Sequence, residues 1–161
     1  MIRRRDAGEI VQLEGLRFDF VGEIHPERSP DGSIAEFLPQ EHYAEVATEH
    51  LSRHGRGPFC KFTLDGAPTG AGIYLVVVDD TVVYVGECHN LAERFGPRGY
   101  GSIEPKNCYS EGQSTKCRVN HNVLVASQAD QRVELWFSDD EQRKRAEDRI
   151  MTHLHPPWNA R

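Results

Sequence analysis

The chain has 161 residues, of which 38% are hydrophobic and 27% charged, and its formal net charge is −6. This composition fits one globular domain with an extension and excludes a disordered chain. The longest uncharged stretch, residues 66–78, is too short to span a membrane, and the start MIRRRDAGEI lacks the apolar run of a signal peptide. We therefore expect a cytoplasmic protein that does not contact membranes.

The first sixty residues contain short alternating runs (EIVQLEGLRFDFVGEI) and then the turn cluster HPERSPDGS. A helix is predicted over residues 40–53, because Tyr43, Val46, Ala47 and Leu51 form one apolar stripe before Gly55. We predict that residues 1–60 form an N-terminal extension that supplies specificity or dimer contacts, and that residues 61–161 form the catalytic domain.

The remaining sequence alternates between β-type and helical patterns. The predicted elements are strands at 73–78 and 82–85, a short helix at 90–95, a long polar loop to Arg118, a helix at 121–129, the strand RVELWF with alternating faces, and a helix at 139–154. The order β-β-α-α-β-α predicts an α+β domain, with a small antiparallel-type central sheet flanked by helices.

The two strands of the predicted hairpin each carry a tyrosine, Tyr74 and Tyr84. If residues 79–80 form the connection, the two tyrosines lie on opposite faces; if residues 79–81 form it, they share a face. Only the second register lets both hydroxyls meet one substrate. Packing at the sheet edge is the alternative explanation for both phenols.

Two charged residues lie on otherwise core-facing sides of helices. Glu147 shares a helix face with Ile150, Met151 and Leu154, where a carboxylate needs a cationic partner or a metal ion. A salt bridge to an arginine would also satisfy it. Arg94 lies on the core-facing side of the short helix, and its planar guanidinium suits a phosphate.

Five of these elements together resemble the GIY-YIG nuclease superfamily. They are GIY ending at Tyr74, YVG starting at Tyr84, NLAER with Arg94, an A-E-x-x-I helix with Glu147, and a proline followed by Asn159 near the end. The resemblance covers residues 70–161 and is greatest to restriction-enzyme-like or uncharacterised stand-alone bacterial members.

The resemblance implies phosphodiester hydrolysis with one divalent ion, Mg²⁺ or Mn²⁺, bound by Glu147. Arg94 would brace the scissile phosphate, Asn159 would hold hydrogen bonds of the site, and Tyr74 and Tyr84 would flank the attacking water, one of them as general base. Which tyrosine is the base stays open. The glycines beside the two phenols are expected to leave room for a phosphate backbone.

The sequence departs from the superfamily pattern at two positions. Glu87 follows YVG where many relatives have lysine, and Arg98 stands one turn after Arg94 where the family has histidine or tyrosine. The proton-transfer partner could therefore be His89, Arg98 or Tyr100.

The segment around GQSTKCRVNHNVL is locally basic, with five Lys or Arg and two Glu between residues 94 and 118. The predicted nucleic-acid-binding side chains are Arg98, Lys106, Lys116, Arg118, Asn120 and Asn122. Asn120 could instead cap the following helix.

These features predict a metal-dependent DNA endonuclease of restriction or DNA-repair type. The alternatives are a non-catalytic nucleic-acid-binding domain and an RNA-directed nuclease, and the sequence does not separate DNA from RNA. Because one active site cuts one strand, we expect a homodimer on DNA.

Overall fold

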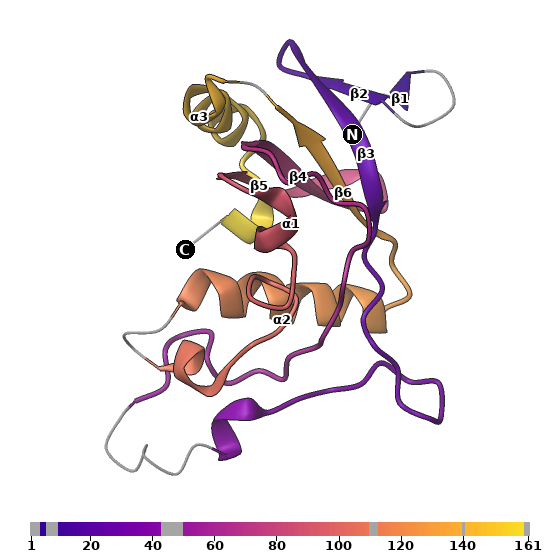
Figure 1. Ribbon diagram of the computed structural model, residues 1–161, viewed down its shortest axis with the longest axis vertical. Helices are drawn as coiled ribbons and strands as arrows, with labels where there is room; N and C mark the ends of the chain where they lie inside the picture. The colour runs from indigo at the N-terminus through magenta and orange to yellow at the C-terminus, as the bar shows by residue number, and fades with distance from the viewer. Residues whose placement is uncertain (1–3, 6–9, 43–49, 110–112, 140, 160–161) are drawn as a thin grey trace. The chain divides into compact units, whose positions relative to one another are not determined.

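The computed structural model describes residues 4–5, 10–42, 50–109, 113–139 and 141–159 (Figure 1). The centre of the helix predicted at 40–53, including Tyr43, Val46 and Ala47, lies outside these residues. On its two sides, Pro39–His42 form a 3₁₀ helix, and Leu51 forms a β-bridge with Tyr109. Residues 50–53 are therefore not helical, and that part of the prediction is wrong.

The described chain forms an α+β fold with one antiparallel sheet, as predicted. The strands are β1 (Arg4–Arg5), β2 (Ile10–Leu13), β3 (Leu16–Glu23), β4 (Gly72–Val78), β5 (Thr81–Cys88) and β6 (Val133–Ser138), in the order β1-β2-β3-β6-β4-β5. The helices are α1 (Leu91–Arg94), α2 (Ser114–Gln128) and α3 (Arg143–Leu154), with 3₁₀ helices η1 (Pro39–His42), η2 (Pro105–Cys108) and η3 (Pro157–Asn159). From β4 onward, strands and helices follow the predicted order β-β-α-α-β-α.

The chain divides into two compact units. The first unit comprises Met1–Ile24, Leu64–Arg94 and Gln131–Arg161, and it contains the sheet, α1, α3 and η3. The second comprises His25–Thr63 and Phe95–Asp130, with η1, η2 and α2. The boundaries of these units differ from the expected domain boundary at residue 60. The specificity or dimer role of residues 1–60 stays a prediction.

The core of the first unit lies between one face of the sheet and α3. Ala146 and Ile150 of α3 pack into a cluster of buried side chains that includes Leu75, Val85 and Trp136. Val11, Leu16 and Phe18 from β2 and β3 belong to the same cluster. The first strands are thus integral to the sheet that carries β4 and β5.

Strand β6 differs from its predicted alternating pattern. It lies between β3 and β4, and all six of its residues are buried. Glu134 is only 3% exposed, and it accepts hydrogen bonds from Arg132 and from Trp136 Nε1 (2.9 Å). Neither face of β6 is therefore exposed to solvent. The buried carboxylate of Glu134 is tolerated because it is paired.

Two helices begin at other residues than expected. Helix α2 starts at Ser114, within the segment predicted as a polar loop, because Cys117, Asn120 and Leu124 recur at helical spacing on a buried face. Helix α3 starts at Arg143, so the acidic residues Asp139 and Glu141 precede it. No helix in the described part of the chain is both long and apolar enough to cross a membrane.

Candidate active site

The β4–β5 hairpin places Tyr74 and Tyr84 on one face. Its connection is the two-residue turn Asp79-Asp80, with φ values of 45° and 68° that match a primed turn. A bulge at Val83 then shifts the register by one residue. The tyrosine rings consequently stack, with centroids 6.0 Å apart and planes at 29°. The connection is thus residues 79–80, for which opposite faces were expected. The bulge nevertheless places both tyrosines on one face.

The glycines beside the phenols accommodate aromatic rings of the protein itself. Gly86 is paired with Tyr74 across the strands, and a Cβ there would lie 2.5 Å from Tyr74 Cζ. A Cβ at Gly72 would lie 2.6 Å from the Phe137 ring. The expectation that these glycines leave room for a phosphate backbone is therefore wrong.

The two phenols differ in their access to solvent. Tyr74 is 0% exposed and Tyr84 is 6% exposed. Tyr84 lies on β5, the last strand in the sheet order, whereas Tyr74 lies on β4 between β5 and β6. Of the two hydroxyls, that of Tyr84 is the better placed to meet a ligand.

Glu147 is half-buried on α3, between the buried anchors Ala146 and Ile150. Burial raises the pKa of its carboxyl, and the negative charges of Glu87 and Asp148 raise it further, whereas the positive charge of Arg94 acts in the opposite direction. Within the described part of the chain, no side chain forms an ion pair with Glu147. The salt-bridge explanation for this residue thus has no support among the described residues.

Arg94 ends α1, the short helix that follows β5. The side chain of Asn90 accepts a hydrogen bond from the Glu93 N–H (3.1 Å) and fixes the start of this turn. The guanidinium acts electrostatically on both Glu147 and the Cys88 thiol. Two predicted site residues 53 positions apart in sequence, Arg94 and Glu147 (147 minus 94), are thereby brought within electrostatic reach.

Asn159 binds the free edge of β5. Its amide accepts a hydrogen bond from the Val85 N–H (2.9 Å) and donates one to the Val85 carbonyl (2.8 Å). The side chain therefore replaces a neighbouring strand directly beside Tyr84. Asn159 thus fixes the backbone of β5. That it also holds hydrogen bonds of an active site stays a prediction.

An Asn159→Ala substitution should lower stability. It leaves both backbone groups of Val85 without their partner, at a cost of ~1–2 kcal/mol. The melting temperature should fall by roughly 3–6 °C. Asn122→Ala, at a half-buried position with no side-chain hydrogen bond in the described structure, is the control. Equal melting temperatures for the two variants would contradict this role.

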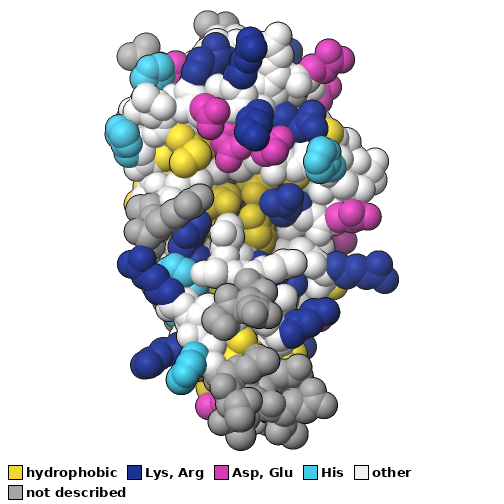
Figure 2. All heavy atoms as spheres, turned by 90° about the vertical axis from the view of Figure 1, so that its left-hand side faces the viewer, with side chains coloured by type: hydrophobic (Ala, Val, Ile, Leu, Met, Phe, Trp, Pro, Cys, Tyr) yellow, Lys and Arg dark blue, Asp and Glu magenta, His cyan; other side chains and the backbone are white. Residues whose placement is uncertain are grey.

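A cation that the sequence analysis missed lies beside Glu87. Arg143 Nε donates to Glu87 Oε2 (3.0 Å), and the same guanidinium contacts His89 Nδ1 (3.3 Å). Glu87 and residues 141–145 line a hollow of about 530 Å³. The basic run Arg143-Lys144-Arg145 is the signal that could have identified it. The upper part of Figure 2 shows acidic and basic side chains interspersed around hydrophobic ones.

The three candidates for proton transfer fall in different units. His89 lies in the first unit, with Tyr74, Tyr84, Arg94, Glu147 and Asn159. Arg98 and Tyr100 belong to the second unit. Arg98 is exposed, and Tyr100 is 4% exposed, with its ring edge-on to Phe95 at 5.2 Å.

Two of the side chains predicted to bind nucleic acid are buried. Asn120 is 0% exposed, and its amide donates to the carbonyls of Cys60 (2.9 Å) and Tyr100 (2.7 Å). It lies inside α2, so it neither caps that helix nor reaches a base. Lys116 is 5% exposed, donates to the Arg98 carbonyl (3.3 Å), and has its pKa lowered by burial. Both predictions are corrected to structural roles.

The other four side chains predicted to bind nucleic acid are exposed or half-buried. Arg98 and Lys106 are exposed, and Lys106 is paired with Glu104 at 3.4 Å. Arg118 and Asn122 are half-buried on α2. Their binding of nucleic acid stays a prediction.

The donor set near Glu147 suits a hard cation. No group of three or more His, Cys, Asp or Glu side chains able to hold a metal ion occurs among the described residues. Glu87 and Glu147 are nevertheless close enough to repel each other. Mg²⁺ binds through one or two carboxylates and keeps several waters, so these residues fit such an ion.

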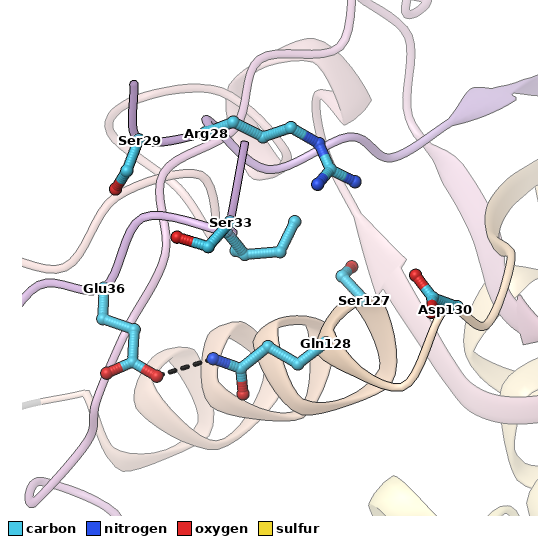
Figure 3. A pocket seen from close by; sticks show the side chains of 8 residues that line it. Arg28, Ser29, Ser33, Glu36, Ser127, Gln128 and Asp130 are labelled. Carbon is cyan, nitrogen blue, oxygen red and sulfur yellow. Dashed lines mark hydrogen bonds between the residues drawn. The ribbon is translucent and has the colours of Figure 1, made fainter. Parts of the chain in front are cut away.

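A second hollow, of about 500 Å³, lies within the second unit (Figure 3). Arg28, Ser29, Ser33, Ile34, Glu36, Ser127, Gln128 and Asp130 line it. Gln128 donates to Glu36 across it at 2.6 Å, and Arg28 donates to the Gly32 carbonyl at 2.5 Å. Its lining carries both signs of charge and none of the predicted site residues.

No protein-family model matches the sequence, and no curated protein matches it. Among solved structures, the chain is similar to a mutant of bacteriophage T4 EndoII, with a TM-score of 0.47 and 22% sequence identity over 70% of this chain and 87% of that one. Similarity at this level carries no argument about function.

Proposed function

We propose that this protein is a metal-dependent endonuclease of the GIY-YIG superfamily that hydrolyses DNA phosphodiester bonds, in restriction or repair. The observation that carries the proposal is the half-buried carboxylate of Glu147, which has no ion-pair partner among the described residues and lies in the same unit as Arg94. The unit that contains them also contains the stacked pair Tyr74 and Tyr84, and Asn159. A carboxylate, a guanidinium and phenols are the groups that metal-assisted phosphodiester hydrolysis needs.

Glu147, aided by Glu87, would hold Mg²⁺ or Mn²⁺. When bound, the ion would offset negative charge on the phosphate and favour ionisation of a water. The repulsion that raises the pKa of Glu147 supports this role, because a cation between the two carboxylates would relieve it.

Arg94 would hold the scissile phosphate through its planar fork of donors. Arg143, bound to Glu87, would supply a cation close to the position where relatives have lysine. These two guanidinium groups would balance the negative charge that develops on the phosphate oxygens in the transition state.

Tyr84 is the better candidate for the general base. Tyr84 is 6% exposed, whereas Tyr74 is 0% exposed. A phenol normally titrates near ~10, so a nearby cation must favour its ionised form. Tyr74 would instead support the Tyr84 ring by stacking on it.

An Arg94→Gln substitution should reduce cleavage by ~10², because it removes a donor to the charge that develops on the phosphate. The measurement is the single-turnover rate on a plasmid with saturating Mg²⁺. Arg149→Gln, at an exposed position of α3, is the control for loss of one positive charge. Equal rates for the two variants would remove Arg94 from the site.

Incubation of supercoiled plasmid with Mg²⁺ tests the proposed function directly. Cleavage should stop in EDTA and with Glu147→Ala. Duplex binding without cutting by the wild-type protein would favour a non-catalytic binding domain. Cutting of single-stranded RNA but not of the plasmid would make RNA the substrate.

A homodimer on DNA should produce double-strand breaks, because each active site cuts one strand. We expect the mass in solution to double on adding a cleavable duplex, and linear plasmid to appear without a nicked intermediate. A monomeric complex with persistent nicks would contradict the dimer and favour a repair nickase.

A further inference from the structure

Four basic side chains gather in the second unit. They are Arg53 and His54, which precede the Phe59 bridge to Phe37, and Arg118 and His121 on α2. The pKa of His54 is lowered, first by burial and then by the positive charges of Arg118, Arg53 and His121. Each of these three groups is therefore close enough to His54 to disfavour its charged form.

The cluster lacks compensating acids within the described part of the chain. None of the four side chains forms an ion pair with a carboxylate there. The segments that supply them, residues 50–64 and 112–129, contain no Asp or Glu, although the chain has 25 acidic residues. Such a concentration of positive charge in an acidic protein needs an explanation beyond solvation.

One donor in the cluster has no acceptor. Arg118 Nε is inaccessible to solvent and makes no hydrogen bond. A buried N–H without a partner is unfavourable, and a bound ion or ordered water is one explanation for such a group in native structures. Because Nε cannot be reached from solvent, an anion would accept from the terminal nitrogens of Arg118, which make no hydrogen bond in the described structure.

The two histidines belong to the same cluster of basic side chains. His121 Nδ1 lies 2.7 Å from the Pro58 carbonyl and donates to it, which ties α2 to the segment that carries Arg53 and His54. His54 is half-buried and next to Arg53. Protonation of His54 on anion binding would add a further positive charge.

We infer that Arg53, His54, Arg118 and His121 form a phosphate-binding site for the backbone of duplex DNA, in addition to the site around Glu147. The inference rests on the proposed function for the identity of the ligand. The planar fork of Arg118 takes one phosphate group, and Arg53 extends the positive surface along the strand.

Salt-dependent binding of a labelled 20-base-pair DNA duplex tests the site. Fluorescence anisotropy is measured in EDTA, so that no cleavage occurs, for the wild-type protein and for Arg118→Gln, Arg53→Gln and Arg17→Gln. Arg17, exposed on β3 and paired with Asp19, is the control for equal loss of charge. Arg53 is exposed, so its variant remains informative should Arg118→Gln impair folding.

Arg118→Gln should weaken binding about tenfold at low salt and reduce the slope of log K against log salt by about 1. Arg53→Gln should change both in the same direction, and Arg17→Gln should change neither. NMR titration of the histidine rings should show the pKa of His54 rising when the duplex is bound, because phosphate offsets Arg53, Arg118 and His121. Variants that bind like Arg17→Gln, with an unchanged His54, would overturn the site.

The inference and the proposed function fail separately. Duplex binding that depends on Arg118 without any cleavage supports the phosphate site and contradicts the nuclease. Normal cleavage with no dependence of binding on Arg118 or Arg53 contradicts the site and leaves the nuclease standing. A dependence found only with a single-stranded RNA of equal length would overturn duplex DNA as the ligand.

Discussion

A Glu147→Gln protein should bind duplex DNA but cleave it at least ~10³-fold more slowly than the wild-type protein. The substitution keeps the shape of the side chain and removes the charge that would hold a divalent cation, and the electrostatic stabilisation of the transition state depends on that charge. The single-turnover cleavage rate with saturating Mg²⁺ measures the effect. Asp148→Asn, at the exposed neighbouring position on α3, is the matched control and should cut normally.

The same residue predicts how cleavage depends on pH. The pKa of Glu147 is raised by burial and by the charges of Glu87 and Asp148, so its carboxyl takes up a proton at a higher pH than an ordinary glutamate does. Since only the ionised form holds a cation, the rate should rise with pH through this raised pKa. The rate is measured between pH 4.5 and 8. A rate that does not rise in this range, as for a glutamate with the ordinary pKa of about 4.3, would contradict this.

Stability separates a ligand-binding role of Glu147 from a structural one. A carboxyl with a raised pKa in the folded state favours folding most at low pH, and this contribution is lost as pH rises through the folded-state pKa. At pH 7.5 the ionised Glu147 therefore destabilises the folded state, and substitution by glutamine removes this destabilisation. The melting temperature of Glu147→Gln should equal or exceed that of the wild-type protein. A clear fall in melting temperature would mean that Glu147 holds the fold.

A Gly86→Ala protein should be strongly destabilised. The added Cβ would lie 2.5 Å from Tyr74 Cζ, and Tyr74 is fully buried against its neighbours, so the ring must move. Forcing extra volume into such a position costs ~2–3 kcal/mol. The melting temperature should then fall by roughly 5–10 °C.

Gly70→Ala is the control for the loss of a glycine in the same unit. A Cβ at Gly70 meets no atom within 4 Å. The ring of Tyr84 stacks on that of Tyr74, so displacement of Tyr74 should also slow cleavage in the Gly86 variant. If both alanine variants melt at the wild-type temperature, the packing of Gly86 against Tyr74 is refuted.

The sequence by itself determined the elements whose pattern is local. Runs of β-branched residues on both sides of Asp79-Asp80 predicted the hairpin, and the structure confirms β4 and β5 there. The order of strands and helices after residue 72 also followed from such runs. The burial of Ile150 and the half-burial of Glu147 agree with the helical spacing on α3.

Only the tertiary structure decided features that depend on distant partners. The bulge at Val83, which puts both tyrosines on one face, lies within the pairing of β4 with β5. Gly86 is needed because Tyr74 occupies the space opposite it on the neighbouring strand. Both are contacts between strands, and residue patterns along one strand do not encode them.

For the charged groups, too, the sequence pattern determined some features and the tertiary structure determined others. Helical spacing placed Glu147 near the core, whereas the pairing of Glu87 with Arg143, and the gathering of Arg118, His54 and Arg53, required the folded chain. Local pattern reports which side chains prefer burial and in which element. Which charges then meet is decided by packing between segments far apart in sequence, because electrostatic contacts depend on distance in space.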